Sequence, residues 1–380
     1  MVKTVIHKLI LAGILLSGLT SCVKSEIRDG GMSDVPMLFS IYASRSTNGI
    51  KADNSYVAPG ITVLPTGSSF GVMAYYQPGT IDSYTGVWAD LATKLWKPDF
   101  MFNEEVTYDG ANYNYSPLRY WPANYENTIS FWAYYPYSVY ATDNSGVMKL
   151  YSNDACTVGY DSSSTGLPRV KYTVPANTND QPDLLFDSFE NRDMTYTNCD
   201  PVDGTVDLNF KHALSLVRFN FGALPEGVSV TVTDMTIRNL YMSGTLTNLT
   251  PATAGAYDWT VTGDRGTSTC SVTDITSSSA AFILMPQSLV NNGDASLEPY
   301  LDITFNMTIA AADGSDPIQY SSNTGTAKLK YIDDVNHAND ILAFAPGKSY
   351  LYTISVTLDT IEFSEAVESP AWDITINTDL

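Results

Sequence analysis

The side chains best suited to chemistry are few, and they gather in one acidic stretch late in the sequence. Asp333, Asp334, His337 and Asp340 lie close together in the chain. Carboxylate oxygens and an imidazole nitrogen can bind a divalent cation. Acidic residues in a loop of so acidic a protein are more often solvated, and we therefore expect no metal site here.

Elsewhere the residues that usually carry catalysis are scattered. There is no His-Glu-x-x-His zinc pattern and no phosphate-binding P-loop. His212 lies in an apolar, β-rich segment and is interpreted as structural. Asp200, Asp203 and Asp207 lack the spacing of a helix–loop–helix calcium site. Two distant carboxylates, as in a glycosidase, would leave no local pattern, and nothing in the sequence supports them. We predict a protein that is not an enzyme and that uses no cofactor or metal.

Cys22 has surroundings that indicate covalent modification. Basic residues near the start precede an apolar stretch at residues 9–16, and Leu19 and Ser21 stand before Cys22 as in a bacterial lipoprotein signal. We expect residues 1–21 to be a lipoprotein signal peptide and Cys22 to be lipidated; an ordinary secretory signal is the alternative. No later stretch approaches the roughly 18 apolar residues of a membrane helix. We therefore expect a mature protein that is tethered to a membrane by its lipid alone.

The other three cysteines are Cys156, Cys199 and Cys270. Their number is odd, and no two of them form a Cys-x-x-Cys pair. The pattern favours three separate buried thiols, and one bridge remains the alternative for an exported protein.

Charge and composition exclude one class of partner. The chain has 380 residues, with 41 acidic and 20 basic side chains and a formal net charge of -21. Nucleic-acid binding depends on neutralising phosphates with Lys and Arg, so we expect no nucleic-acid partner. Because 44% of residues are hydrophobic and only 16% charged, the chain can form a sizeable core.

Short alternating apolar runs dominate the chain and predict strands. Met37, Phe39 and Ile41 share one face of an early strand. At the other end, Trp372, Ile374, Ile376 and Leu380 alternate with polar residues. A polar stretch at residues 191–204 is the best candidate for a boundary between two domains. We therefore predict an all-β fold with two tandem antiparallel β-sandwich domains. The expected parts are a tether and first strand at residues 22–45 and domains at 46–200 and 201–380.

Several stretches, in order, resemble the fimbrillin family, the lipoprotein pilins of anaerobic Gram-negative bacteria. They are Tyr-Ser-Pro-Leu-Arg-Tyr-Trp-Pro at residues 115–122, Ile-Ser-Phe-Trp-Ala-Tyr-Tyr-Pro at 129–136, Asp-Leu-Leu at 183–185, the segment 206–219 and Ala-Pro-Gly-Lys-Ser-Tyr at 345–350. Together with the lipoprotein signal, the likeness spans most of the chain. It implies two transthyretin-like domains.

The resemblance also implies assembly by strand exchange. In such pilins an arginine-specific protease removes the leader and first strand, and another subunit's strand fills the groove. The matching parts here are Arg45 and Ser46 as the processing site and Met37, Phe39 and Ile41 as the displaced strand, with residues 372–380 as the donor. Arg28 is a second candidate for cleavage. The terminal strand could instead complete its own domain, as most last strands do.

The expected function is therefore that of a structural subunit of cell-surface fimbriae that supports adhesion, with other fimbrial subunits as partners. The alternative is a monomeric or fimbrial-tip surface lipoprotein that binds a glycan or host protein. Trp121, Trp132, Tyr134 and Tyr135 could stack against sugar rings, but core packing is the favoured interpretation of this cluster.

Overall fold

The structure of the protein is a computed structural model. The described residues are 32–43, 64–77, 100–123, 127–137, 139–142, 148–152, 156–159, 169–181, 183–192, 204–246, 259–270, 275, 280–311, 314–333, 335, 337–356 and 361–369. Within these ranges the regular structure consists of strands and short 3-10 turns. The prediction of an all-β fold is confirmed.

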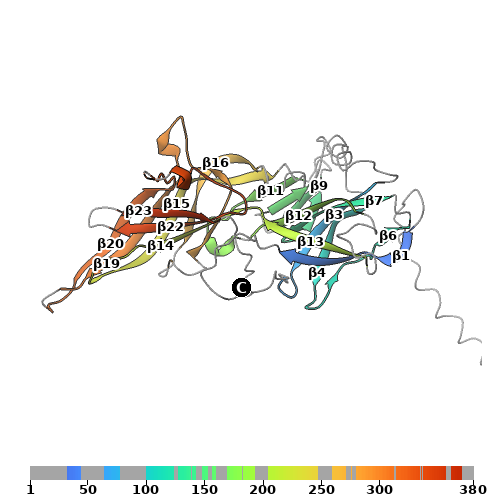
Figure 1. Ribbon diagram of the computed structural model, residues 1–380, viewed down its shortest axis with the longest axis horizontal. Helices are drawn as coiled ribbons and strands as arrows, with labels where there is room; N and C mark the ends of the chain where they lie inside the picture. Colours follow the sequence, from blue (N-terminus) through green and yellow to red (C-terminus); the bar gives the residue numbers. More distant parts are fainter. Residues whose placement is uncertain are drawn as a thin grey trace, which may run out of the picture.

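A seven-stranded sheet lies toward one end of the molecule (Figure 1). Its order is β2 (Leu38–Ala43), β13 (Thr205–His212), β12 (Leu185–Arg192), β7 (Thr128–Tyr135), β3 (Ser69–Gln77), β4 (Met101–Tyr108) and β5 (Tyr113–Asn114). The pairs are antiparallel except that β2 runs parallel to β13. The early strand predicted from the alternation of Met37, Phe39 and Ile41 is therefore an edge strand of this sheet.

An eight-stranded sheet is organised around one long strand, β15 (Val228–Leu246). The first part of β15 pairs with β19 (Tyr300–Ile309), which continues to β20 (Ile318–Lys328). Its last part pairs with β11 (Arg169–Thr173), followed by β10 (Cys156–Gly159), β9 (Met148–Ser152) and β8 (Val139–Thr142). The strand β16 (Trp259–Cys270) also pairs with β15.

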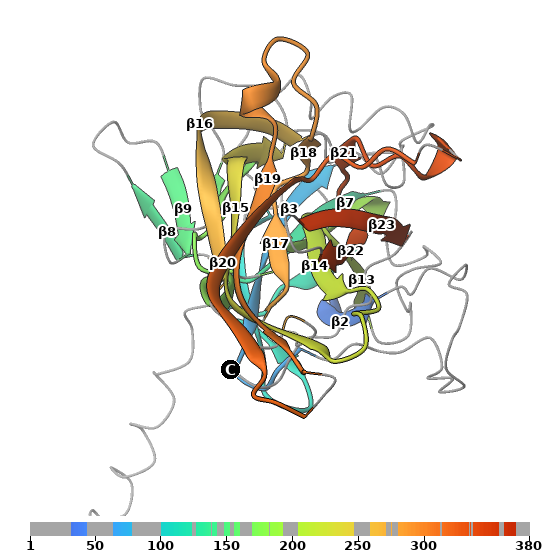
Figure 2. The same ribbon diagram turned by 90° about the vertical axis from the view of Figure 1, so that its left-hand side faces the viewer.

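A four-stranded sheet and two small ones complete the described structure. The four strands are β17 (Phe282–Leu284), β14 (Ser215–Phe221), β22 (Ser349–Val356) and β23 (Ile361–Ser369). The view along the molecule shows β22 and β23 beside β15, β19 and β20 (Figure 2). The small pairs are β1 (Met32–Pro36) with β6 (Tyr120–Pro122), and β18 (Gln287–Ser288) with β21 (Ala343–Phe344).

Two apolar clusters form the core, and β7 contributes to both. Ile129, Phe131 and Ala133 belong to the N-terminal cluster, while Trp132 and Tyr134 belong to the larger C-terminal one. Successive side chains of a strand point to opposite faces, so this sheet is buried on both faces. That explains why β7 ends in an unbroken apolar and aromatic run, Phe-Trp-Ala-Tyr-Tyr at residues 131–135, rather than an alternating one.

Strand pairing crosses the predicted domain boundary at residue 200 in both directions. β13 follows residue 200 but pairs with β2 and β12, and β11 precedes it but pairs with β15. β13 and β14, which are joined just after His212, each bury every second residue over most of their length. The division into two domains at residue 200 stays a prediction.

Candidate first-strand site

The segment of interest comprises residues 32–43, hereafter the first segment, which contains β1 and β2. β1 pairs with β6, whereas β2 pairs with β13 in six consecutive residue pairs from Leu38 with Thr205 to Ala43 with Phe210. β2 therefore completes one edge of the seven-stranded sheet although its partner lies far away in the sequence.

Three side chains of the first segment enter the N-terminal cluster. Met37, Phe39 and Ile41 are each at most 5% exposed. The Phe39 ring makes edge contacts with Phe70 at 6.1 Å and Phe131 at 6.2 Å between centroids. Burying an apolar side chain contributes about 1.5 to 3 kcal/mol, so the three together contribute about 5 to 9 kcal/mol before ordering costs. Loss of this segment would leave an apolar groove.

Met37 lies between β1 and β2, and its backbone is held by the loop at residues 115–119, hereafter the 115–119 loop. The Met37 N–H donates to the Arg119 carbonyl at 2.9 Å. The Tyr115 hydroxyl donates to the Met37 carbonyl at 2.8 Å and accepts from the Arg119 N–H at 3.2 Å. Both polar groups of the Met37 backbone are thus satisfied by one loop.

Gly204 holds the same junction from the side of β13. Its carbonyl accepts from the Leu38 N–H at 3.3 Å and from Trp121 Nε1 at 2.8 Å. Its φ is +73°, a left-handed conformation that favours glycine. A Cβ at this position would lie 2.4 Å from the Pro36 carbonyl oxygen. Only glycine lets the chain pass this closely to the first segment.

Polar side chains fix the register of β2. The Ser40 hydroxyl donates to the Asp207 carboxylate on β13. Two residue pairs further on, the Asn209 N–H donates to the Asp187 carboxylate of β12 at 2.5 Å. These contacts tie β2, β13 and β12 together in one register.

A half-buried ion pair lies beside the 115–119 loop. Arg119 Nη2 is 4.0 Å from Glu104 Oε2 of β4. Burial raises the pKa of the Glu104 carboxyl, and the charge of Arg119 opposes that rise. Burial also raises the pKa of the Tyr115 hydroxyl well above its usual value. Tyr115 is therefore neutral, and its O–H remains a donor, throughout the physiological range.

Several predicted site residues lie outside the described residues. They are the lipidation site Cys22, the processing site Arg45 and Ser46 with its alternative Arg28, and the donor-strand residues Trp372, Ile374, Ile376 and Leu380. Their roles stay predictions. Among the described residues no helix is long and apolar enough to cross a membrane.

The aromatic cluster is part of the core. Trp121, Trp132 and Tyr134 are fully buried, and Tyr135 packs at the border of the N-terminal cluster. Trp132 and Tyr134 pack at 5.4 Å between ring centroids. The core interpretation is confirmed for this cluster, which offers no platform for a sugar ring.

Two other residues have the structural surroundings expected of them. His212 is buried, and its Nδ1 lies 2.7 Å from Asp183 Oδ2 where β12 begins beside the end of β13. Cys270 is a buried free cysteine, and burial raises the pKa of its thiol. Such a thiol is poorly reactive. The side chains of Cys156 and Cys199 lie outside the described residues.

The acidic stretch near residue 337 is a loop that is stabilised by hydrogen bonds among its own residues. Asp333 accepts from the Val335 N–H at 2.9 Å and from Asn339 Nδ2 at 2.7 Å. Asp340 accepts from the Asp333 N–H at 2.8 Å. Nowhere in the described ranges do three or more His, Cys, Asp or Glu side chains gather where a metal ion could bind. Asp334 lies outside those ranges.

Residues 67–71 read Gly-Ser-Ser-Phe-Gly, which fits the Gly-x-Ser-x-Gly spacing of a serine nucleophile. A nucleophile of that kind sits on a sharp turn between a strand and a helix. Here Ser69 is the first residue of β3, and its hydroxyl is 2.9 Å from the Thr107 hydroxyl of β4. Ser69 is therefore an ordinary strand residue, and the Gly-x-Ser-x-Gly match does not mark a nucleophile.

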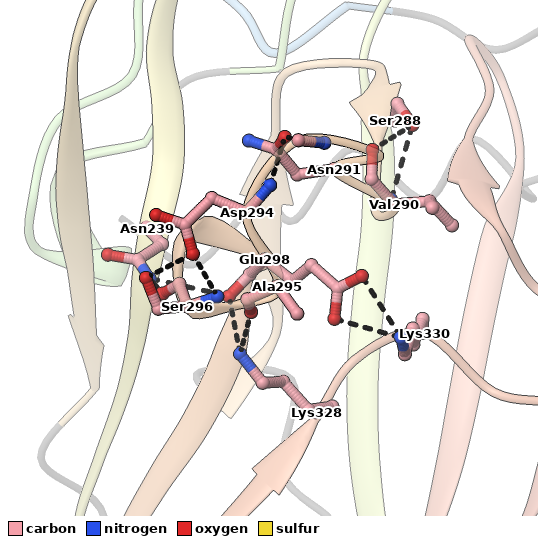
Figure 3. Close-up of polar contacts among 11 residues, drawn as sticks. Asn239, Ser288, Val290, Asn291, Asp294, Ala295, Ser296, Glu298, Lys328 and Lys330 are labelled. Carbon is pink, nitrogen blue, oxygen red and sulfur yellow. Dashed lines mark hydrogen bonds and ion pairs between the residues drawn. The ribbon is translucent and has the colours of Figure 1, made fainter.

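A second polar cluster lies in the loop at residues 288–298, between β18 and β19 (Figure 3). The Glu298 side chain is only 3% exposed and lies 2.9 Å from Lys330 Nζ. Lys328 Nζ donates to the Ala295 carbonyl at 2.8 Å, and Asn239 Nδ2 donates to the Ser296 carbonyl at 2.7 Å. The charges face backbone and partner groups of the protein itself, so the cluster holds the loop in shape.

The residues that hold Met37 were missed by sequence reasoning. Tyr115 is one of 25 tyrosines, and nothing local marks its hydroxyl as the partner of a distant backbone. Gly204 was detectable in part, because Asp-Gly is a turn signal that indicates a positive φ. Its close approach to Pro36 depends on the tertiary fold.

A family model and solved structures match this chain. A solved fimbrial protein from Bacteroides vulgatus is similar with a TM-score of 0.51 and 18% identity, over 89% of this chain and 100% of that chain. The tip fimbrial protein from Porphyromonas gingivalis, with a C-terminal truncation, matches with a TM-score of 0.33 and 12% identity, over 81% of this chain and 95% of that chain. No curated protein matches the chain. The model of the fimbrillin-like family matches residues 60–370. The chain therefore belongs to the fimbrillin-like family.

Proposed function

We propose that this chain is a non-enzymatic structural subunit of cell-surface fimbriae that is polymerised by β-strand donation. Membership of the fimbrillin-like family supports the fimbrial role. The observation that carries strand donation is the first segment: it buries three apolar side chains, and its edge strand β2 pairs with a strand remote in the sequence. Its removal would expose an apolar groove and the unpaired backbone of β13, which an incoming strand could cover.

The donor is the segment at residues 372–380. Its apolar residues Trp372, Ile374 and Ile376 have the same every-second-residue spacing as Met37, Phe39 and Ile41. An extended strand with this spacing presents three side chains to one face, as the groove requires. Leu380 extends the same face.

Export and maturation follow from the predicted sites. Lipidation at Cys22 anchors the precursor in the outer membrane, and cleavage between Arg45 and Ser46 separates the first segment from the rest of the chain. The cut itself breaks no contact of β2 with β13, because that strand ends before Arg45. The first segment then leaves and the donor of another subunit takes its place.

Deletion of residues 372–380 tests the donor assignment. We expect the deletion to abolish polymers on a gel run without boiling, while the monomer keeps its thermal transition. Ile374→Asp is the matched point variant, with Thr375→Asp on the opposite face as its control. Ile374→Asp should prevent assembly and Thr375→Asp should not. Unchanged polymers in the deletion would refute the donor assignment.

A further inference from the structure

We propose that the 115–119 loop is a latch that sets how readily the first segment leaves its sheet. This inference rests on the proposed function for its biological meaning. The latch consists of the Tyr115 hydroxyl and the Arg119 backbone, and the residue that it holds is Met37. It makes release of the first segment a step separate from cleavage of the chain.

The geometry around Met37 differs from that of an ordinary ladder position. Met37 is the one residue of the first segment outside β1 and β2, yet its N–H and its carbonyl are both bonded. The Tyr115 hydroxyl donates to the Met37 carbonyl of the first segment and accepts from the Arg119 N–H of its own loop. A single oxygen atom therefore links the loop to the first segment. The loop therefore grips the segment at its middle.

Tyr115 is itself well positioned for this role. Its ring packs edge-on against Phe39 at 5.5 Å between centroids, on the same apolar cluster that takes the first segment. The ring that places the hydroxyl beside Met37 thus also contacts the Phe39 side chain. Loss of the hydroxyl alone would leave that packing in place.

The position of Met37 explains why the latch would control release. The β1–β6 ladder has an irregular register, with Met32 opposite Pro122 and Pro36 opposite Tyr120. The β2–β13 ladder is regular over six pairs. Opening that begins at either end of the segment reaches Met37 before the whole segment is free. At that point the two Met37 hydrogen bonds must break, and the buried Met37 side chain must become exposed.

Amide hydrogen exchange of the full chain tests the latch in the Tyr115→Phe variant. A buried hydrogen bond contributes about 0.5 to 1.5 kcal/mol, and we therefore expect exchange at residues 37–43 to become about two- to tenfold faster. Tyr120→Phe is the matched control, because Tyr120 lies on β6 nearby and is 38% exposed. Amides of β22 serve as the reference for global opening.

Two results would overturn the proposal. One is equal exchange at residues 37–43 in the Tyr115→Phe and Tyr120→Phe variants; the other is an equal acceleration at β22, which would indicate a general loss of stability. Should Tyr115→Phe fail to fold, the unaltered chain provides the test. The Met37 amide should then exchange more slowly than the Leu38 amide, and the reverse order would refute the latch.

These outcomes are independent of polymer formation. Exchange is measured within one chain, so a failure to polymerise would count against the proposed function and leave the latch standing. Polymers that form at the same rate with and without the Tyr115 hydroxyl, despite faster exchange, would show that release of the first segment does not limit assembly. That result would refute control of assembly by the latch.

Discussion

The edge strands β2 and β20 are held in opposite ways. β2 buries Phe39 and Ile41 in the N-terminal cluster and pairs in parallel with β13, more than 160 residues away. β20 is joined to β19 as the next strand along the chain, and it exposes Ile318 by 55% and Tyr320 by 40%. β2 is joined to its sheet only by pairing with a strand remote in the sequence, whereas β20 forms a hairpin with β19. The comparison supports the proposal that β2, rather than β20, is the edge at which a strand is exchanged.

The edge at β20 also has a feature that discourages pairing. The register between β19 and β20 shifts near Ser322, whose φ is +56°. The Ser322 N–H donates to the Asn306 side-chain carbonyl at 2.9 Å. A bulge of this kind interrupts the regular row of backbone groups that another strand would need.

The largest expected contrast comes from truncating one side chain at each edge. Phe39→Ala should lower the free energy of unfolding by about 3 to 5 kcal/mol, because it leaves a cavity in the N-terminal cluster. Tyr320→Ala should cost less than about 1 kcal/mol, because that side chain is largely exposed. Urea denaturation of both variants measures the difference. Equal losses would mean that burial does not distinguish the two edges.

Gly204 provides the next test, with Gly263 as its control. Both have positive φ, at +73° and +87°, but no atom lies within 4 Å of a Cβ at Gly263. Backbone strain should cost about 1 kcal/mol in Gly263→Ala. Gly204→Ala should lose about 2 to 4 kcal/mol, because its Cβ also collides with the Pro36 carbonyl. The free energies of unfolding of the two variants measure the added cost. Similar values would show that the close approach has no energetic weight.

Lys330 and Lys348 each form an ion pair with a glutamate, and the two glutamates differ in burial. Lys330→Met should cost about 1 to 2 kcal/mol, because it leaves the buried Glu298 carboxylate without its ion-pair partner. Lys348→Met should cost about 0 to 1 kcal/mol, because its partner Glu368 is 44% exposed. Thermal denaturation of the two variants at one pH compares them. A larger loss from Lys348→Met would contradict this account.

The smallest effect is a difference in pH dependence between Glu104 and Glu298. Hydrogen bonding to Lys330 lowers the pKa of Glu298, so its stabilisation is present above the unfolded pKa near 4.3 and is lost as the pH falls through the folded pKa. Burial raises the pKa of Glu104, so its contribution is present below the unfolded pKa and is lost as the pH rises through the folded one.

Substitution by glutamine separates the two carboxyls. Glu298→Gln should lower the melting temperature more at pH 7 than at pH 3, and Glu104→Gln should lower it more at pH 3 than at pH 7. Melting curves across that range give both slopes. Slopes of the same sign would show that one of the two pKa directions is wrong.

Much of the fold could be read from local patterns. Alternation at Met37, Phe39 and Ile41 predicted a strand with one buried face, because side-chain direction has a period of two in any strand. The aromatic run of β7 was correctly interpreted as core.

Pairing partners could not be predicted in the same way. Nothing in the sequence near Leu38 specifies that β2 runs parallel to β13, and nothing near Tyr115 specifies Met37 as its partner. The expected boundary at residue 200 rested on turn residues and stays a prediction, and those residues did not reveal that β13 pairs with the earlier strands β2 and β12. Turn signals report where the chain bends, and they do not report which sheet it joins.

The most direct test of the central claim is the N-terminal residue of the assembled protein. Polymers sheared from the surface of cells that express the full chain would be analysed by N-terminal sequencing and intact mass. Strand exchange predicts that the assembled subunit begins at Ser46 and has lost the first segment. Polymers whose subunits keep a lipidated Cys22 and an intact segment at residues 23–45 would contradict the account.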